Sequence, residues 1–397
     1  MSFYPECPMF NQKKYQNDEA FKQMEVALAV DDQDRKETTD LLKEVIEKKL
    51  ISLMKRDQLF QLIFDRIDIG GSDYKGTNYG KPNEVELHLV HKLGEINSTI
   101  DSSHYKNGYV KIKLNYSKAR DPNYLKYRDI LPIITDHDNY LDQTKFQHWL
   151  DGVFSMAIET FFTSKPGLSN HEFEYNGITF QMNHKKPGPR FTMSFTSSGP
   201  TSRTLDVKLV SAFEFNGVQL SSSYERYNDD RLPFRVTLKP FDGCGSNSDL
   251  HWRLSFLENE KDMLRDELKP VIKLIKKLRD VHDLKRFTGY QIETIFYHEM
   301  FKYRSYLPQF LGASKTFLFI HGLKELLAAL EKGYLASFWN SNYRLIDSFD
   351  MVYYDQGRRL RKILYELDSN IEGDPVYSLL CSVEYYSWTS NSHWWNR

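Results

Sequence analysis

The chain has 397 residues, of which 40% are hydrophobic and 14% aromatic, and its formal net charge is -1. This composition excludes an intrinsically disordered chain, and the length favours two domains or one large body of two lobes. Because the net charge is close to zero, any binding of nucleic acid must come from a local basic face and not from the field of the whole molecule.

The first predicted elements are an arm and a long helix. Residues 1–34 are polar and of mixed charge, which predicts a mobile or loosely docked arm. From Arg35 to Ile67, apolar residues recur at helical spacing without glycine or proline. This pattern predicts one long helix that could break near Asp57. Its apolar positions are Leu42, Ile46, Leu50, Leu53, Phe60, Ile63 and Phe64.

Strand patterns begin after Gly70-Gly71, where the helical pattern stops. Alternation over 84–90 places Val85, Leu87 and Leu89 on one face of a strand and Glu84, Glu86 and His88 on the other.

Further strands are predicted over 108–116, 191–195 and 204–215. A helix is predicted over 143–162, and a hairpin over 171–182 that turns at Asn176-Gly177.

After about Trp252 the pattern is helical almost to the end. The order of elements therefore predicts an α+β fold, in which a lobe with a mixed sheet precedes a helical lobe. The predicted division is a flexible arm over 1–34, a long helix with the sheet core over 35–255, and the helical lobe over 256–397.

The cysteines and the N-terminal sequence indicate the cellular compartment in which the protein is expected. Cys7, Cys244 and Cys381 are odd in number and far apart, which suits a reducing compartment better than a disulfide framework. No pair has the spacing of a thiolate zinc site, so no structural zinc is expected. Neither a leader pattern nor an apolar stretch of about 20 residues is present, which predicts a cytoplasmic protein without a membrane segment.

Two acids, Glu84 and Glu86, project from one side of the same strand pattern. Their carboxylates repel each other unless a cation lies between them, and Mg²⁺ usually combines one or two protein carboxylates with substrate phosphates. Just before them, Gly71-Ser72 predicts a tight turn whose backbone donors and hydroxyl can approach a triphosphate. The alternative is a solvated strand face after an ordinary turn.

The spacing of these features favours the first interpretation. Gly-Ser, eleven residues and then Glu-x-Glu between apolar positions match the arrangement in nucleotidyltransferases of the polymerase-β type. Such a site needs a third carboxylate from another strand, and Asp206 lies on the strand face opposite Leu205 and Val207. The alternative for Asp206 is a surface aspartate. The pattern predicts an Mg²⁺ site, which Mn²⁺ could also occupy.

Four ordered segments carry a more specific resemblance: YKGTNYGKPNEVELHLV, TLDVKLVSAFEF, HWRLSFLENEKDML and FTGYQIETIFYHE. Together they resemble the cyclic GMP-AMP synthase-like receptors and the related male-abnormal developmental-protein family. The resemblance covers most of the chain from about Arg35 onward. It implies a bilobal polymerase-β-like nucleotidyltransferase core with a long N-terminal spine helix and a helical C-terminal lobe.

The resemblance also implies an activity and its residues. A member of this family in innate immunity makes a cyclic dinucleotide such as cyclic GMP-AMP from ATP and GTP, while two metal ions align the in-line attack. The implied catalytic and metal-binding residues are Glu84, Glu86 and Asp206. The implied nucleotide contacts are Gly71 and Ser72 for phosphate, Arg253 for a base, Lys276 for phosphate and Tyr290 for stacking on a base.

The sequence departs from the family pattern at three places. Glu86 stands where the family usually has aspartate, and Gly289 stands where it often has serine. The zinc ribbon of the vertebrate DNA sensor is missing between WRLSF and the following helix. The resemblance is therefore to the invertebrate receptors, which sense double-stranded RNA more often than DNA.

Basic residues on two predicted helices could contact the phosphates of a duplex. The alternative is a solvated helix face with neighbouring acids such as Glu44 and Asp280. The oligomeric state stays open, including a dimer induced by nucleic acid. The candidate nucleic-acid contacts are Lys48, Lys55, Arg56, Lys277, Lys285 and Arg286.

The sequence thus predicts a nucleotidyltransferase that senses double-stranded RNA and synthesises a cyclic dinucleotide. One alternative is a catalytically weak or inactive scaffold of the same family, which Glu86 and Gly289 favour. Another is an enzyme that extends an RNA end and releases linear products.

Overall fold

The computed structural model describes most of the chain. It divides into two compact units: a sheet unit, Asp31–Tyr74 with Lys81–Lys261, and a helical unit, Met1–Val30 with Lys75–Gly80 and Asp262–Arg397. The described residues are 15–27, 32–79, 83–94, 96–101, 108–115, 127–163, 171–185, 191–198, 202–215, 232–238, 248–284, 286–347 and 351–369.

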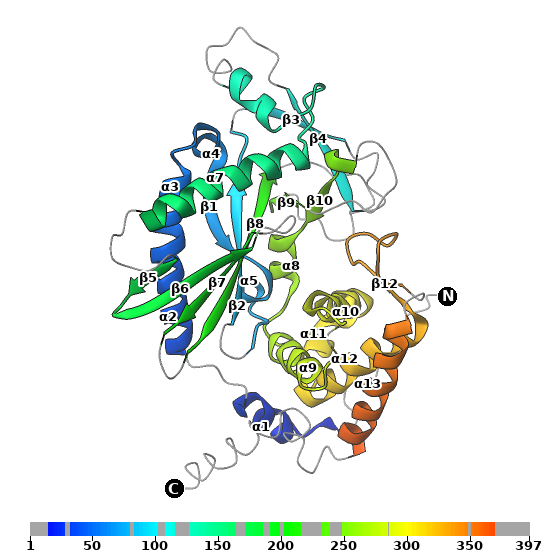
Figure 1. Cartoon of the computed structure of the whole chain (residues 1–397). Helices are drawn as coiled ribbons and strands as arrows, with labels where there is room; N and C mark the ends of the chain where they lie inside the picture. The colour runs from blue at the N-terminus through cyan, green and yellow to red at the C-terminus, as the bar shows by residue number, and fades with distance from the viewer. Residues whose placement is uncertain are drawn as a thin grey trace. The chain divides into compact units, whose positions relative to one another are not determined.

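One ten-stranded sheet forms the centre of the sheet unit (Figure 1). Its strands are β1 (Phe64–Ile69), β2 (Glu84–His91), β3 (Asn97–Asp101), β4 (Tyr109–Asn115), β5 (Glu172–Tyr175), β6 (Ile178–Lys185), β7 (Phe191–Ser197), β8 (Thr204–Phe215), β9 (Phe234–Thr237) and β10 (Trp252–Ser255). Eight strands follow the order β3-β4-β10-β9-β8-β7-β6-β5, and β2 joins β1 to β8 outside this path. The pairing of β2 with β8 is parallel, whereas β1 with β2 and β7 with β8 are antiparallel.

The predicted long helix is a series of segments that ends earlier than expected. The break predicted near Asp57 is confirmed, because the Asp57 carboxylate caps the next helix by accepting a hydrogen bond from the Phe60 backbone N–H at 2.8 Å. The segments are α2 (Asp32–Leu42), a π-helical stretch (Lys43–Leu50), α3 (Ile51–Met54) and α4 (Gln58–Ile63).

The prediction that this helix continues to Ile67 is wrong. Phe64 begins strand β1, in which Ile67 pairs with Leu89 of β2. Phe60 and Phe64 do stack on each other, with ring centroids 5.0 Å apart, as their helical spacing suggested. Pairing with a strand far along the chain therefore overrides the local helical pattern at this point.

Helix α7 (Gln143–Thr163) packs on the sheet, as its predicted apolar stripe requires. Its Phe146 contacts Phe213 of β8 and Trp252 of β10, with ring centroids 5.2 and 5.6 Å apart. Helix α7 also contacts α3, and the two lie side by side in Figure 1. The remaining helices of this unit are the 3-10 turns Leu131–Ile133 and Ser248–Leu250, α5 (Gly71–Lys75) and α8 (Leu257–Met263), of which α5 and α8 each extend a short way past the unit boundary.

The predicted hairpin is confirmed. Strands β5 and β6 pair in register with Tyr175 opposite Ile178. The two turn residues, Asn176 and Gly177, have φ angles of 50° and 75°. Two positive φ angles are what a two-residue turn needs to match the twist of the strands.

The helical unit packs around α12. This helix contacts α9, α10 and α13, and Gly322 allows the close approach, because a Cβ there would lie 2.6 Å from Phe296 and 2.9 Å from Ile275. The elements are α1 (Glu19–Ala27), α9 (Lys269–Val281), α10 (Gly289–Lys302), a 3-10 turn (Arg304–Tyr306), α11 (Leu307–Leu311), α12 (Lys315–Lys332), β11 (Tyr334–Ala336), β12 (Arg344–Asp347) and α13 (Met351–Ser369).

Part of the predicted N-terminal arm is a packed helix. Phe21 and Met24 of α1 are fully buried in the core of the helical unit. The Asp18 carboxylate accepts a hydrogen bond from the Thr316 backbone N–H at 2.9 Å, which ties the segment to the start of α12. Apolar side chains and this cap hold residues 15–27 in place, whereas composition alone suggested a loose segment.

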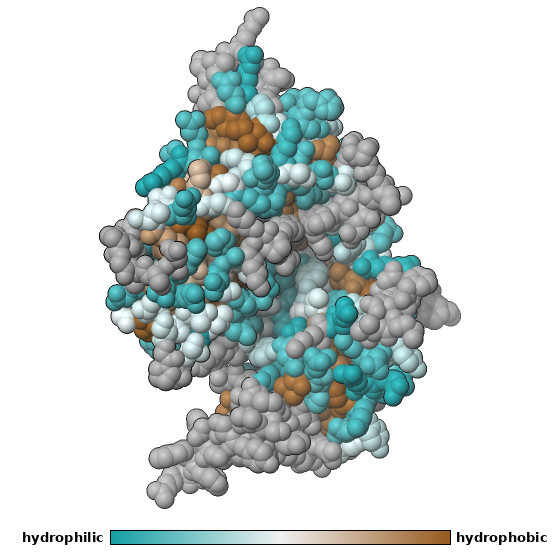
Figure 2. Space-filling model, viewed as in Figure 1, coloured by the Kyte–Doolittle hydropathy of each residue, from teal (hydrophilic) through white to brown (hydrophobic). Residues whose placement is uncertain are grey.

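Hydrophilic side chains cover much of the face shown in Figure 2, with smaller hydrophobic patches between them. Among the described residues, Met156 and Tyr365 are examples of large hydrophobic side chains that are exposed. No helix in the described part of the chain is long and apolar enough to cross a membrane.

His91, the last residue of β2, is completely buried among aromatic rings. Phe60, Phe146 and Phe213 surround it, with ring centroids 5.3 to 6.0 Å from its own. Neither ring nitrogen has a hydrogen-bond partner among the described residues. Burial therefore lowers the pKa of His91 to about 3, because a charged imidazole has no compensation in this environment.

This histidine predicts a loss of stability in mild acid. The unfolded chain takes up a proton at His91 below about pH 6.5, whereas the folded chain does so only near pH 3. Between pH 7.5 and pH 5 the free energy of unfolding should therefore fall by about 2 kcal/mol through this residue. His91→Leu should remove that part of the pH dependence in urea unfolding curves. An unchanged slope in the variant would contradict the prediction.

Candidate active site

The parallel pairing of β2 with β8 brings the three predicted acids together. Glu84 lies directly opposite Asp206, and Glu86 lies opposite Lys208. Neighbouring strands are about 4.8 Å apart, and residues two apart on one strand share a face. Glu84, Glu86 and Asp206 therefore lie on one face at the beginning of two adjacent strands.

Each of the three carboxylates has a protein partner on one oxygen. The Lys208 ammonium lies 2.6 Å from Oε1 of Glu84, and the Ser194 hydroxyl donates to Oδ1 of Asp206 at 2.5 Å. Nε2 of His88 lies 2.9 Å from Oε1 of Glu86. The side chains of Glu84 and Glu86 remain 53% and 27% exposed, so solvent and ligands reach both acids.

The predicted phosphate turn lies against Glu86. The Gly70 N–H donates to the backbone oxygen of Glu86 at 2.7 Å. Gly71 has a φ of 57°, in the left-handed region that favours glycine, and a Cβ built there would lie 3.6 Å from Oε1 of Glu86. Ser72 follows in the short helix α5. The structure thus brings Gly71, Ser72 and Glu86 together.

These residues fit a divalent cation. Three carboxylates share this face, and the Lys208 ammonium pairs with Glu84. Their ligand oxygens do not all lie within 4.8 Å of one another, so a bound cation would have to draw them closer. Carboxylate oxygens are the ligands that Mg²⁺ and Mn²⁺ prefer. Lys208, His88 and Ser194 each contact one of these acids and help to hold its carboxylate in place.

Next to these acids lies an ionic cluster that the sequence patterns did not indicate. Its centre is Arg235 of β9, which is only 1% exposed. The guanidinium contacts carboxylates from three elements, Asp68 of β1, Glu214 of β8 and Glu258 of α8. Arg66 also bonds Glu214, at 2.6 Å, which raises the pKa of Arg66. The residues of this cluster are far apart in sequence, so no local pattern could reveal it.

Arg253, the predicted base contact, lies on β10. Its guanidinium is 5.3 Å from the ring centre of Tyr109, the residue with which it pairs in the sheet. Gly108 makes room for this arrangement, since a Cβ there would lie 3.2 Å from Nη1 of Arg253. The guanidinium thus lies over an aromatic ring, a common arrangement for arginine.

Lys276, the predicted phosphate contact, is buried in the helical unit. Its ammonium donates to Glu293 at 2.7 Å and to the Thr77 hydroxyl at 2.8 Å. Lys75 also pairs with Glu293, so two buried ammonium groups share one buried carboxylate. Burial alone would raise the pKa of Glu293, but the two lysines outweigh it and lower that pKa to about 2. Burial lowers the pKa of Lys276, although the nearby Glu293 carboxylate acts to raise it.

Tyr290, the predicted stacking residue, begins α10 beside this cluster. The Lys75 ammonium lies 5.3 Å from the centre of its ring. The neighbouring Gly289 also has a packing role, because a Cβ at this position would lie 3.0 Å from Cε of Lys276. The glycine that replaces the family serine therefore leaves space for the buried lysine.

Comparison with known proteins places the chain in a family. Residues 73–266 match the Mab-21 protein nucleotidyltransferase domain, and residues 267–359 match the Mab-21 protein HhH/H2TH-like domain. The chain belongs to the Mab-21 nucleotidyltransferase family. This result confirms the resemblance found in the sequence.

Several relatives of this Mab-21 protein carry the name cyclic GMP-AMP synthase-like receptor. One from Trichogramma pretiosum is 34% identical over 377 residues, 92% of this chain and 76% of the relative. One from Aethina tumida is 26% identical over 86% of this chain and 85% of the relative. A third, from Microplitis demolitor, is 27% identical over 92% of this chain and 68% of the relative.

The predicted nucleic-acid contacts of this Mab-21 protein belong to different units. Lys48 is 71% exposed and pairs with Glu44 at 3.1 Å, and Lys55 and Arg56 are exposed at the end of α3. In the helical unit, the Lys277 ammonium lies 5.9 Å from the centre of the Tyr79 ring. Arg286 is exposed, and Lys285 lies outside the described residues.

Two other clusters have the residue types of a metal site. The first, Asp136 with His137 and Asp138, lies in a turn in which Oδ1 of Asp136 accepts the backbone N–H groups of Asp138 and Tyr140. The second, Glu299 with His321 and Glu325, contains the Lys302 ammonium 3.1 Å from Glu299. In the first cluster, Asp136 stabilises the turn through its backbone hydrogen bonds. In the second, the Lys302 ammonium already supplies a positive charge beside Glu299.

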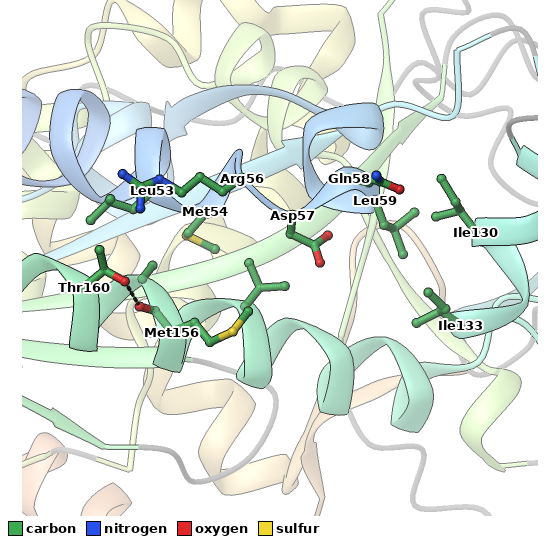
Figure 3. A pocket seen from close by; sticks show the side chains of 12 residues that line it. Leu53, Met54, Arg56, Asp57, Gln58, Leu59, Ile130, Ile133, Met156 and Thr160 are labelled. Carbon is green, nitrogen blue, oxygen red and sulfur yellow. Dashed lines mark hydrogen bonds between the residues drawn. The ribbon is translucent and has the colours of Figure 1, made fainter.

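A cavity of about 490 Å³ opens beside the break between α3 and α4. Figure 3 shows Leu53 and Met54 on one side of it and Met156 and Thr160 of α7 on the other. Apolar side chains contribute most of its lining, with Arg56 and Asp57 at the break. None of the three predicted acids lines this cavity, so in this Mab-21 protein the cavity is separate from the acids on β2 and β8.

Proposed function

We propose that this protein senses double-stranded RNA and synthesises a cyclic dinucleotide of the cyclic GMP-AMP type from ATP and GTP. The observation that carries the proposal is that Glu84, Glu86 and Asp206 share one face of β2 and β8, with Gly71 beside Glu86. The name that several relatives share supports this product class.

The three acids would hold two divalent cations, Mg²⁺ or Mn²⁺. When bound, these ions would neutralise the triphosphate and favour in-line attack at its α-phosphorus by a ribose hydroxyl, which gives up its proton while pyrophosphate leaves. Asp206 acts from a fixed position, since Ser194 orients one of its oxygens. Glu86 acts next to Gly71, whose missing Cβ lets the backbone approach a phosphate closely. The chain's own contribution is thus the positioning of charges and reactants.

Nucleotide binding would also use Arg253, Lys276 and Tyr290. Arg253 is held beside Tyr109 and would present its donors to a base. Lys276 would donate to phosphate oxygens in place of the Thr77 hydroxyl, since phosphate accepts charge-assisted hydrogen bonds as carboxylates do.

The activator would contact the exposed basic residues of both units. Lys48, Lys55 and Arg56 lie on the segmented helix, and Lys277 and Arg286 lie in the helical unit. Lysine and arginine contacts of this kind recognise the duplex backbone and not the base sequence. Such a sensor would act in the cytoplasm as a part of innate immunity.

The direct test incubates the purified chain with Mg²⁺ or Mn²⁺, labelled ATP and GTP, and either double-stranded RNA or double-stranded DNA. Mass spectrometry of the products should detect a cyclic dinucleotide in the RNA reaction. Only linear products would indicate an enzyme that extends an RNA end. No nucleotide product under any of these conditions would contradict the proposal.

A catalytically weak or inactive scaffold is the second candidate. It is favoured by the pairing of Lys208 with Glu84 and by the burial of Lys276 against Glu293. The two candidates differ in a cellular test, in which Glu84→Gln combined with Glu86→Gln removes two acids. An unchanged cellular phenotype would favour the scaffold, whereas its loss would favour the enzyme.

A further inference from the structure

Glu86 is one methylene longer than an aspartate, and His88 contacts its carboxylate from the same strand face. Nε2 of His88 lies 2.9 Å from Oε1 of Glu86, and the His88 side chain is 5% exposed. A longer acid has an additional rotatable bond, so it loses more conformational freedom when it holds a cation. A buried hydrogen-bond partner reduces that cost by fixing the carboxylate in advance.

The other nitrogen of the His88 ring determines which nitrogen carries the proton. Nη1 of Arg235 lies 3.4 Å from Nδ1 of His88. A guanidinium can only donate, so Nδ1 of His88 is the acceptor in this contact and Nε2 is the ring nitrogen that can donate. His88 in this form donates its Nε2–H to Glu86.

Arg235 can hold His88 in this form because the arginine is itself fixed. Asp68, Glu214 and Glu258 contact its guanidinium from three different elements. Gly70 completes the arrangement, since a Cβ there would lie 2.4 Å from Cδ2 of His88. These contacts with the imidazole and with Arg235 all come from residues of the sheet unit. Gly70 leaves the space that the imidazole occupies.

We propose that Arg235 and His88 are positioning residues that hold the longer carboxylate of Glu86 in the geometry that binds a divalent cation. The proposal rests on the function proposed above, because it assigns a cation to Glu84, Glu86 and Asp206. It also explains why glutamate serves at a position where the family usually has aspartate. Hydrogen bonds to metal-binding side chains of this kind typically change metal affinity by about 10- to 100-fold.

The test measures Mn²⁺ affinity by electron paramagnetic resonance on the full chain, without nucleotide. His88→Leu should weaken Mn²⁺ binding by about 10-fold or more, because Glu86 loses its hydrogen bond. His88→Gln, whose amide can still donate, should remain within about 3-fold of the wild type. His91→Leu is the matched control, since His91 is buried on the same strand and contacts aromatic rings instead of an acid. It should leave the affinity unchanged.

A second variant covers the case in which His88→Leu fails to fold. Glu86→Asp shortens the acid, so its carboxylate cannot reach His88 and the cation together, and it should weaken Mn²⁺ binding while His88 is present. In a double-mutant cycle the losses from Glu86→Asp and His88→Leu should not add.

Two results would overturn the proposal, and they differ in what else they affect. If the wild type binds Mn²⁺ in a manner that depends on Glu84, but His88→Leu or Glu86→Asp binds it equally well, the positioning role is wrong and the proposed function stands. If the wild type shows no Mn²⁺ binding that depends on Glu84, both the positioning role and the proposed function fall.

Discussion

Asp206→Asn is expected to lower the rate of nucleotide transfer by at least about 100-fold, equivalent to about 3 kcal/mol of activation free energy. The physical reason is the loss of a negative charge from a group of three acids that must hold divalent cations against a triphosphate. The Asp206 backbone and its pairing with Glu84 would remain, so melting temperature should change little. The rate of product formation in the presence of RNA is the measurement.

Asp138→Asn provides the control for this prediction. Asp138 belongs to the acidic turn that also has metal-binding residue types, and its side chain is 63% exposed. The variant removes a carboxylate of the same kind from a place that we do not assign to the reaction, so its rate should match the wild type. A loss of less than about 3-fold in Asp206→Asn, or a large loss in Asp138→Asn, would contradict the assigned site.

Glu293→Gln is expected to destabilise the protein by about 3 to 5 kcal/mol. Glu293 is the carboxylate that Lys75 and Lys276 share, and all three residues are almost completely buried. The variant keeps the shape of the side chain but removes the carboxylate charge that two buried ammonium groups share. Urea unfolding at neutral pH is the measurement.

Lys75→Met is the matched control for that variant. It removes one ammonium group and leaves Lys276 paired with Glu293, so the charges balance and the cost should be clearly smaller than for Glu293→Gln. A larger loss of stability in Lys75→Met would contradict the assignment of Glu293 as the shared counter-ion. The pH dependence adds a check, since the contribution of ionised Glu293 is lost as pH falls from about 4.5 towards 2.

Local periodicity predicted most of the helices and strands, because these elements depend largely on residues that are close together in the sequence. The hairpin at Asn176-Gly177 and helix α7 follow from turn chemistry and from an apolar stripe, both visible within about 20 residues. Phe64 shows where this approach fails. It continues a helical pattern, yet its place in β1 is determined by pairing with His91, which no local pattern contains.

The candidate site divides in the same way. The spacing of Glu84, Glu86 and His88 predicted their shared strand face, and the alternation around Asp206 predicted its strand. Arg235 could not be predicted, because its partners on β1 and α8 are distant in sequence. The burial of Lys276 was missed for a similar reason, since Thr77 lies far from it along the chain and Glu293 lies on a different helix.

The most direct test of the three-acid site is the location of a bound cation. Crystals of the chain grown with Mn²⁺ and an ATP analogue that cannot be cleaved at its α-phosphate would be measured at the manganese absorption edge. The anomalous map should place Mn²⁺ within about 2.2 Å of oxygens from Glu84, Glu86 and Asp206. An ion bound instead at Asp136 or Glu299, with no density between β2 and β8, would contradict the account.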